Sequence, residues 1–362
     1  MKTIFHIDVN NAFLSWTAVY LLNNGYNKDI REIPSIISGN QEERHGIVLA
    51  KSPLAKKYKI KTGESIYEAK QKYNQIEIYE PNFEWYKKES KELMEYLKQY
   101  SLLLEQFSID ECFLDMTREN YDKNNYVDLA YKIKNEIKYK FNFTVNIGIA
   151  NNKLCAKMAS DFEKPDKVHT LWETQIATKL WPLDVEDLFM CGRKTSEKLK
   201  QMKINTIFDL AHTKKSTLIK QFGTRANYLY DAAWGRDESN IQTHKRKEKS
   251  IGVQSTLKED TNDITYINNI IYNQIKQIAE EIKKKKLYST TIVIFIKDSN
   301  FKTTSFQTKL RYPTNDVEIL YNNAKETIQR NYNNNYIRLI GIRLKDLTQN
   351  TYEQMSIYDY FN

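Results

Sequence analysis

The sequence predicts an α+β protein built from several domains, and three observations support this. The chain has 362 residues, more than a single domain usually holds, so two to four domains are expected. Strand-like and helix-like segments alternate through residues 1–165, and a second such series follows residue 250. Between them, residues 244–249 (HKRKEK) carry almost no apolar side chains and are typical of a linker.

The first series predicts a sheet domain with its helices on one face. Strands are expected, in chain order, at residues 2–9, 46–51, 102–109, 112–116 and 143–150. Apolar residues at helical spacing predict helices at residues 12–22, 82–100 and 127–141, and a fourth helix starts after Asn151 or Asn152 and ends before Pro165. Residues 25–38 are expected to be irregular, and residues 53–61 form a basic segment.

The rest of the chain predicts two further regions. Residues 166–235 show the pattern of short helices joined by turns. From residue 250 a β-α-β-β-α-β order is expected, which is the order of a split βαβ fold. Its six elements are predicted at residues 250–257, 265–286, 289–296, 302–310, 317–332 and 337–344. Residues 351–362 lie beyond it as a tail.

Composition excludes some classes of protein and favours a polyanionic partner. The formal charge is +9, although lysine-rich surfaces also occur on proteins without such a partner. The cysteines Cys112, Cys155 and Cys191 form no CxxC pair, so neither a disulfide framework nor a zinc site is expected. No apolar run reaches about 18 residues, and the N-terminus leads directly into a strand, so we expect a cytoplasmic protein without a membrane span or signal peptide.

Three carboxylates stand in unusual surroundings. Asp8 ends the first predicted strand inside an apolar run, and Asp110 and Glu111 sit between two apolar segments. Taken alone, Asp110 and Glu111 also fit a solvated hairpin tip. If the first strand lies beside that hairpin, however, the three acids converge and need divalent cations to relieve their repulsion. Oxygen ligands select magnesium, and two ions about 4 Å apart suit in-line phosphoryl transfer.

Four motifs then occur in a fixed order. They are Asp8-Val9-Asn10 with Phe13 and Ser15, the SIDE tetrapeptide at residues 108–111, Asn152-Lys153-Leu154, and Ala159-Ser160-Asp161 followed by Lys164-Pro165. In this order they resemble the Y-family DNA polymerases of the translesion type, in their DNA polymerase IV-like branch. The similarity spans nearly the whole chain.

The resemblance implies an α+β multidomain right-hand polymerase. Its expected parts are a ferredoxin-like palm (residues 1–12 and 76–165), small fingers (13–75), a helical thumb with a helix-hairpin-helix (166–243), a linker (244–249), a split βαβ little finger (250–347) and a tail (348–362). The implied activity is low-fidelity, DNA-directed DNA synthesis that extends primers across damaged templates without proofreading. The implied partners are primer-template DNA and a dNTP, and we expect a monomer.

The resemblance also assigns the active site. Two Mg²⁺ ions are expected on Asp8, Asp110, Glu111 and the main-chain carbonyl of Val9. The expected nucleotide contacts are Asn11, Ala12, Phe13, Ser52, Lys56 and Lys164. Among them Phe13 is the sugar gate that rejects a ribose 2′-hydroxyl, although without the motif it would be read as a core residue. Lys56 stands where relatives commonly carry Arg, and Pro53 stands where they carry Tyr. Two of the usual side-chain contacts to the triphosphate are therefore expected to be altered.

Contacts to DNA and to a sliding clamp are implied as well. In residues 188–210 a helix-hairpin-helix would bring Gly192, Arg193 and Lys194 to DNA phosphates. Met190 replaces the first glycine of that motif, so an ordinary helical turn is the alternative. The linker residues Lys245, Arg246 and Lys247 are further DNA contacts. The tail peptide Gln354, Met355, Ser356, Ile357 and Tyr358 is similar to clamp-binding peptides.

Three other functions remain open at this point. One is a partner-dependent or catalytically weak Y-family subunit, suggested by Pro53 and Lys56. The second is a non-enzymatic DNA-binding scaffold. The third is a metal nuclease, because acidic clusters also cut DNA.

Overall fold

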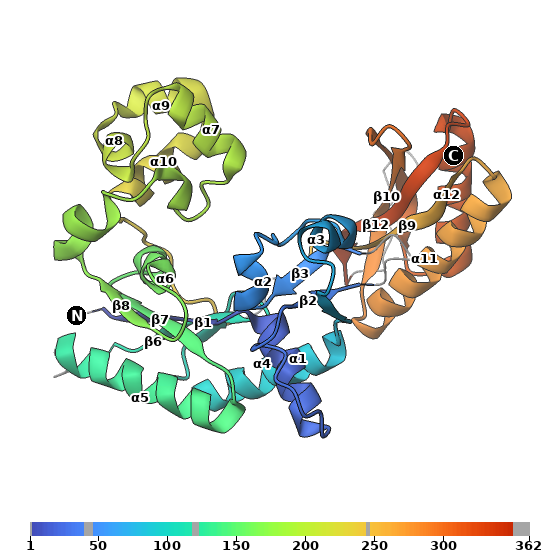
Figure 1. The fold of residues 1–362 in the computed structure, drawn as a ribbon. Helices are drawn as coiled ribbons and strands as arrows, with labels where there is room; N and C mark the ends of the chain where they lie inside the picture. Colours follow the sequence, from blue (N-terminus) through green and yellow to red (C-terminus); the bar gives the residue numbers. More distant parts are fainter. Residues whose placement is uncertain (1, 40–45, 118–122, 244–246, 350–362) are drawn as a thin grey trace. The chain divides into compact units, whose positions relative to one another are not determined.

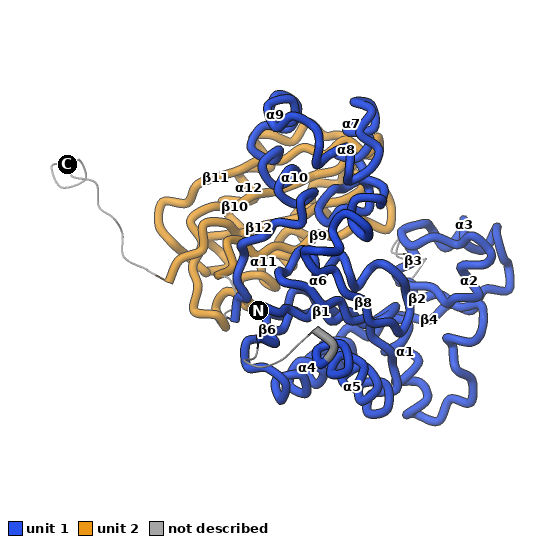
Figure 2. The backbone as a smooth tube through the Cα atoms, turned by 90° about the vertical axis from the view of Figure 1, so that its left-hand side faces the viewer, with its two compact units in different colours: residues 1–39, 47–245 blue, residues 40–46, 246–362 orange. Residues whose placement is uncertain are grey.

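The computed structural model describes residues 2–39, 46–117, 123–243 and 247–349. The chain divides into two compact units, the first formed by residues 1–39 and 47–245 and the second by residues 246–362 with the short stretch 40–46 (Figure 2). Among the described residues, no helix has the length and apolarity needed to cross a membrane. The three cysteines are buried and free.

The first unit is built on a five-stranded sheet with the strand order β5-β6-β1-β7-β8 (Figure 1). The central strand pairs antiparallel with both of its neighbours, and the last pair of strands is parallel. The strands are β1 Ile4–Val9, β5 Leu104–Gln106, β6 Glu111–Asp115, β7 Val145–Ala150 and β8 Val168–Leu171. The strands predicted at residues 2–9, 102–109, 112–116 and 143–150 are therefore confirmed here. β1, β5 and β7 are shorter than predicted, β6 is shifted by one residue, and β8 is an addition.

Helices cover both faces of this sheet, so the expectation of helices on one face is wrong. Phe5, Ile7 and Val9 of β1 join an apolar core with α1 (Ala12–Asn23), α4 (Phe83–Leu97) and α5 (Lys123–Phe141). The alternate residues of β1 point to the other face, where α6 (Lys153–Asp161) lies (Figure 1). Because α6 is short and is buried along most of its length, its sequence does not show which face it covers.

Asparagine side chains cap two of these helices, α6 and α4. The side chain of Asn152 accepts a hydrogen bond from the Cys155 N–H at 2.8 Å and so caps α6. Asn82 caps α4 in the same way, through the Trp85 N–H at 3.0 Å. The prediction of a cap at this point of the chain is confirmed for Asn152.

A small three-stranded sheet with the order β3-β2-β4 follows α1 in the chain. Its elements are β2 Ser35–Ser38, β3 Val48–Lys51, α2 Pro53–Lys57, α3 Ile66–Lys72 and β4 Glu77–Tyr79. The expectation that residues 25–38 are irregular is therefore wrong for β2. All four residues of β2 are buried, so its sequence lacks the alternation of polar and apolar residues that marks a half-exposed strand.

Residues 166–243 are largely helical, as predicted, except that they begin with β8. This strand has four residues, three of them only half-buried, and it carries little sequence signal of its own. Two 3-10 helices, Glu173–Gln175 and Val185–Asp187, and a π-helix, Ile176–Leu180, come first, and α7 Arg193–Gln201, α8 Ile207–His212, α9 Lys215–Phe222 and α10 Arg225–Ala233 follow. Trp181, after the π-helix, and Trp234, at the end of α10, meet edge to face with ring centroids 5.3 Å apart.

Met190 adopts the backbone conformation that the missing glycine would favour. Its φ is +64°, in the left-handed region, and the residue is 60% exposed. Gly192 then precedes the first residue of α7. The turn before α7 thus keeps a glycine-like shape despite the substitution.

The second unit has the predicted β-α-β-β-α-β order. Its elements are β9 Ser250–Thr261, α11 Ile264–Lys284, β10 Tyr288–Asp298, β11 Thr303–Thr314, α12 Val317–Asn331 and β12 Ile337–Thr348. The strands form one antiparallel sheet in the order β11-β10-β12-β9. The two helices pack on it through apolar residues at helical spacing, such as Ile271, Ile275 and Ile278 of α11.

The buried Glu89 of α4 makes the stability of the first unit dependent on pH. Burial, assisted by the charge of Glu92, raises the pKa of Glu89 from its ordinary value of 4.5 to about 7. The protonated form is therefore favoured in the folded state, and the cost of ionising it grows as the pH rises from 4.5 to 7. We expect Glu89→Gln to stabilise the protein by about 1–3 kcal/mol at pH 8 and by much less at pH 5.

Urea unfolding at the two pH values measures this difference. Glu95→Gln is the control, because Glu95 lies on the same helix and is exposed. A gain from Glu89→Gln that is the same at both pH values would contradict the assignment.

Candidate active site

The pairing of β1 with β6 brings the predicted carboxylates together. In this register Asp8 lies directly opposite Glu111, and Asp110 immediately precedes β6. The Val9 N–H donates to the Asp110 carbonyl at 3.0 Å, which closes the end of the pair. All three acids line one cavity of about 370 Å³, together with Val9, Asn11, Ala12, Phe13, Leu49, Ala50, Lys157 and Lys164.

His6 supports Glu111 from below the cavity. Its ring is fully buried, with Nε2 3.1 Å from Glu111 Oε2 and Nδ1 2.8 Å from Ser160 Oγ. Because the Glu111 carboxylate only accepts, we assign a ring proton to Nε2. The Ser160 hydroxyl also donates to the Lys157 main-chain carbonyl at 2.8 Å, so its single proton is shared between that carbonyl and Nδ1. Burial lowers the pKa of His6, so the neutral ring is the form expected at pH 7.

Lys157 and Lys164 supply the positive charge of the site. Lys157 Nζ lies 3.2 Å from Asp8 Oδ2 and 3.1 Å from Glu111 Oε2, and Lys164 Nζ lies 2.9 Å from Asp8 Oδ2. Burial alone would raise the pKa of Glu111, but the hydrogen bond from His6 and the charge of Lys157 outweigh it and lower that pKa to about 2. Glu111 is therefore ionised at neutral pH.

The sequence analysis singled out neither His6 nor Lys157. The sequence does contain a signal for Lys157, which is a charged residue within the run of small and apolar residues CAKMAS. The structure shows that all residues of this run are buried in α6. A lysine at such a position needs a carboxylate partner, whereas a lysine on an exposed face does not. His6 alternates with Asp8 on β1 and so points to the same face.

Asp110 completes the acidic group from the loop before β6. Burial, with the nearby charges of Asp8 and Glu111, raises the pKa of Asp110, while a hydrogen bond from the Ser108 hydroxyl opposes that rise. Within the described residues, the atoms of His6, Asp8 and Glu111 that could bind a metal lie within 4.8 Å of one another. Since His6 already bonds Glu111 and Ser160, the carboxylate oxygens are the donors that remain for a metal ion.

Phe13 forms one wall of the cavity and is held from behind. Its ring stacks on Tyr86 with centroids 4.9 Å apart and planes 9° apart. The Tyr86 hydroxyl is 2.6 Å from Thr17 Oγ1, which fixes that ring in turn. Next to Phe13, Asn11 has a left-handed φ of +49° and donates from its side chain to the Lys51 carbonyl at 2.6 Å.

Two predicted nucleotide contacts lie elsewhere. Ser52 is buried, and its hydroxyl oxygen accepts from the N–H groups of Ser35 and Ala55, so it caps α2. Lys56 is exposed on α2. Burial lowers the pKa of Lys51, and the nearby charge of Lys56 lowers it further. In the described part of the chain, neither Ser52 nor Lys56 belongs to the lining of the 370 Å³ cavity.

The predicted DNA contacts are only partly described. Gly192, Arg193 and Lys194 lie at the start of α7, where Arg193 pairs with Glu197 at 2.7 Å. Lys247 is exposed. Lys245 and Arg246, and the tail peptide Gln354, Met355, Ser356, Ile357 and Tyr358, lie outside the described residues.

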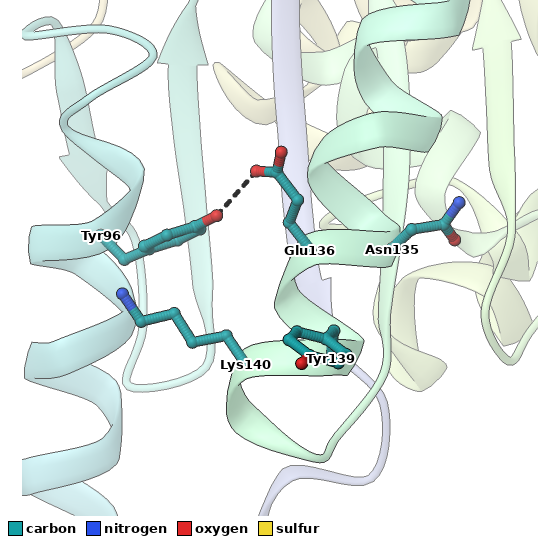
Figure 3. Close-up of a pocket in the computed structure, with 5 residues that line it drawn as sticks. All are labelled: Tyr96, Asn135, Glu136, Tyr139 and Lys140. Atoms are coloured by element: carbon teal, nitrogen blue, oxygen red, sulfur yellow. Dashed lines mark hydrogen bonds between the residues drawn. The ribbon is translucent and has the colours of Figure 1, made fainter.

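A second hollow lies between α4 and α5, on the other side of the sheet (Figure 3). Tyr96 reaches across it and donates to Glu136 at 2.7 Å, and Lys140 Nζ lies 4.3 Å from the centre of the Tyr96 ring. Asn135 and Tyr139 complete its lining. Its acid and its base already have partners, so we assign it no chemistry.

Comparison with known proteins follows the same division of the chain. Residues 7–161 match the model of the impB/mucB/samB family, and residues 248–357 match that of the impB/mucB/samB family C-terminal domain. The sequence is 39% identical to DNA polymerase IV of Clostridium acetobutylicum, over 99% of this chain and 90% of that protein. It is 30% identical to DNA polymerase IV 1 of Bacillus subtilis, over 99% of this chain and 86% of that protein.

Solved structures show the same fold at lower identity. The Y-family DNA polymerase chimera Dbh-Dpo4(243-245)-Dbh superposes with a TM-score of 0.84 at 22% identity, over 96% of this chain and 100% of that one. DinB from Sulfolobus solfataricus gives a TM-score of 0.61 at 23% identity, over 96% and 100% of the two chains. These likenesses confirm the expected α+β fold of the right-hand polymerase type.

The approach of α6 to the sheet depends on Gly148 of β7, directly opposite His6. A Cβ at this position would lie 2.0 Å from the Ala156 carbonyl oxygen and 2.5 Å from the Ser160 nitrogen. We expect Gly148→Ala to push α6 away and to lower the free energy of unfolding by about 3 kcal/mol.

Urea unfolding measures that change, with Gly192→Ala as the matched control. A Cβ at Gly192 meets nothing within 4 Å, so its replacement should change stability by no more than about 0.5 kcal/mol. Equal effects of the two alanines would show that α6 is not held closely at Gly148.

Proposed function

The chain belongs to the impB/mucB/samB family of Y-family DNA polymerases, and we propose that it is a low-fidelity DNA-directed DNA polymerase that extends primers across damaged templates. The observation that carries this proposal is the cavity in which Asp8, Asp110 and Glu111 meet Phe13 and Lys164. It combines donors for divalent cations, an aromatic wall and a cation, which are the groups that a deoxynucleoside triphosphate requires.

The metal in this proposal is magnesium, with two ions held by Asp8, Asp110, Glu111 and the main-chain carbonyl of Val9. The free donors of the site are oxygens, which magnesium prefers, and the charge of three acids suits divalent cations. When bound, the ions supply Lewis-acid activation of the primer 3′-hydroxyl and neutralise charge on the triphosphate.

The nucleotide would be held by the chain's own cations and amides. Lys164 lines the cavity and is the proposed contact to the triphosphate. The Asn11 side chain donates to the Lys51 carbonyl and does not cap α1. We therefore propose that the main-chain N–H groups of Asn11 and Ala12 face phosphate. Lys56 would act as an outer point charge, and Ser52 would contribute by shaping α2.

Phe13 is the proposed sugar gate. The stacked Tyr86 behind it prevents the ring from moving away, so a ribose 2′-hydroxyl would meet a fixed wall. Selection for deoxyribose would then come from shape rather than from a hydrogen bond.

DNA binding is assigned to the helical region and to the second unit. Gly192, Arg193 and Lys194 at the start of α7 are proposed phosphate contacts, and the linker residues Lys245, Arg246 and Lys247 would add positive charge. Binding should therefore depend on salt and be indifferent to sequence.

The proposed domains follow the family. The palm comprises residues 1–12 and 76–165, the fingers 13–75, the thumb 166–243 and the little finger 250–347. Because β8 joins the palm sheet, we move residues 168–171 from the thumb to the palm. We further propose a cytoplasmic monomer whose tail residues 354–358 bind a sliding clamp.

Primer extension on a defined template with Mg²⁺ tests the proposed function. Wild type should extend with dNTPs, and Asp110→Ala should lose activity by about 10³-fold or more, because a metal ligand is removed. Phe13→Ala should keep dNTP extension and reduce discrimination against ribonucleotides by about 10²-fold, because the wall is removed.

Other outcomes point to other functions. DNA binding without extension by wild type would leave the scaffold or the partner-dependent subunit, to which the altered positions Pro53 and Lys56 would then contribute. Mg²⁺-dependent cleavage of DNA without nucleotides would indicate a nuclease.

A further inference from the structure

The two paired carboxylates divide their oxygens between two environments. Asp8 Oδ2 meets the ammonium groups of Lys157 and Lys164, and Glu111 Oε2 meets Lys157 and His6. Within the part of the chain that the structure describes, Asp8 Oδ1 and Glu111 Oε1 make no hydrogen bond or ion pair. One oxygen of each acid, Asp8 Oδ2 and Glu111 Oε2, is therefore bound by these side chains. We call these two the inner oxygens, and the unbound Asp8 Oδ1 and Glu111 Oε1 the outer oxygens.

Lys157 is the one group in this set that touches both acids. Its side chain is only 10% exposed, and it also meets Asp161 at 3.3 Å. Lys164 is more exposed and reaches Asp8 but has no ion pair with Glu111 among the described residues. His6 reaches Glu111 but has no hydrogen bond to Asp8 among the described residues. Two carboxylates side by side at low dielectric repel strongly, and an ammonium between them reverses the sign of that interaction.

The backbone fixes Lys157 at this place. It follows Ala156, whose carbonyl oxygen lies against Gly148, so this turn of α6 sits as close to the sheet as a glycine allows. Ser160, one turn later, bonds His6. The backbone on either side of Lys157 is therefore held against the sheet, and the lysine side chain is mostly buried rather than on a surface.

We propose that Lys157 is a positioning residue, an internal counter-cation that holds the inner oxygens of Asp8 and Glu111 and keeps their outer oxygens directed at the cavity. It relieves the repulsion of the pair independently of any divalent cation. It does not touch the substrate in this role. The proposal rests on the proposed metal site.

A lysine that serves only to stabilise the fold predicts something different. Its loss would lower stability by the same amount with or without Mg²⁺. Loss of a counter-cation would be repaired by Mg²⁺, because the divalent ion can neutralise the two carboxylates instead.

Lys153 is the matched control. It lies one turn earlier on α6, its side chain is 12% exposed, and it pairs with the buried Glu105 at 2.7 Å. It has the same residue type, helix and degree of burial as Lys157, and its partner is a carboxylate outside the cavity.

The experiment is thermal unfolding of the full chain as wild type, Lys157→Gln, Lys157→Arg and Lys153→Gln, each in EDTA and in millimolar Mg²⁺. In EDTA we expect both glutamine variants to lose about 3–6 °C in Tm. In Mg²⁺, Lys157→Gln should recover at least about half of that loss, and Lys153→Gln should recover none. Lys157→Arg, which keeps the charge, should behave as wild type.

A Tm deficit of Lys157→Gln that is the same in EDTA and in Mg²⁺ would overturn the proposal. So would a rise in Tm on addition of Mg²⁺ that is as large in wild type as in Lys157→Gln. If Lys157→Gln does not fold in EDTA, refolding on addition of Mg²⁺ supports the proposal and failure to refold overturns it. Primer extension by wild type in the same Mg²⁺ solution separates the two claims. If wild type extends primers and the Tm deficit of Lys157→Gln is equal in EDTA and Mg²⁺, only the role of Lys157 is rejected. If wild type does not extend primers, the proposed function is rejected.

Discussion

The structure of this site depends on one electrostatic constraint, which is that Asp8 and Glu111 lie directly opposite each other on adjacent strands. Like charges in such a pair repel, and burial under a helix increases the cost. Basic and donating groups offset this cost by contacting one oxygen of each acid, and these groups are Lys157, Lys164 and His6. Within the described residues the other oxygen of each acid has no hydrogen bond or ion pair, so the same two acids can be stable in the fold and still offer oxygens to a cation.

The two faces of the sheet separate apolar packing from the polar groups of the site. Along β1, Phe5 and Ile7 enter an apolar core beneath α4 and α5, while His6 and Asp8 point to α6. One face therefore supplies stability through burial, and the other holds the polar groups at fixed distances. Gly148 connects the two functions, because its missing side chain lets α6 bring Lys157 and Ser160 down to the acids.

Local sequence signals predict most of the helices and strands and the three carboxylates of the site. They do not predict the residues that hold those carboxylates in place. The second unit was predicted in full because α11, with Ile271, Ile275 and Ile278, has clear apolar periodicity. Asp8 was recognisable as an acid in an apolar strand, and the motifs joined it to Asp110 and Glu111. The strands β2 and β8 were missed because four residues that are fully buried or half-exposed show no alternation. His6, Lys157 and the capping role of Ser52 depend on strand pairing and helix placement, which single-sequence patterns do not contain.

The most direct test of the central claim is the position of the metal ions themselves. Crystals of the protein with primer-template DNA, a non-reactive dNTP analogue and Mn²⁺ would locate the ions by anomalous scattering. We predict two ions about 4 Å apart, bound by Asp110 and by the outer oxygens of Asp8 and Glu111, with Lys157 still in contact with the inner oxygens. Ions bound elsewhere, or bound in place of Lys157 at the inner oxygens, would contradict the account.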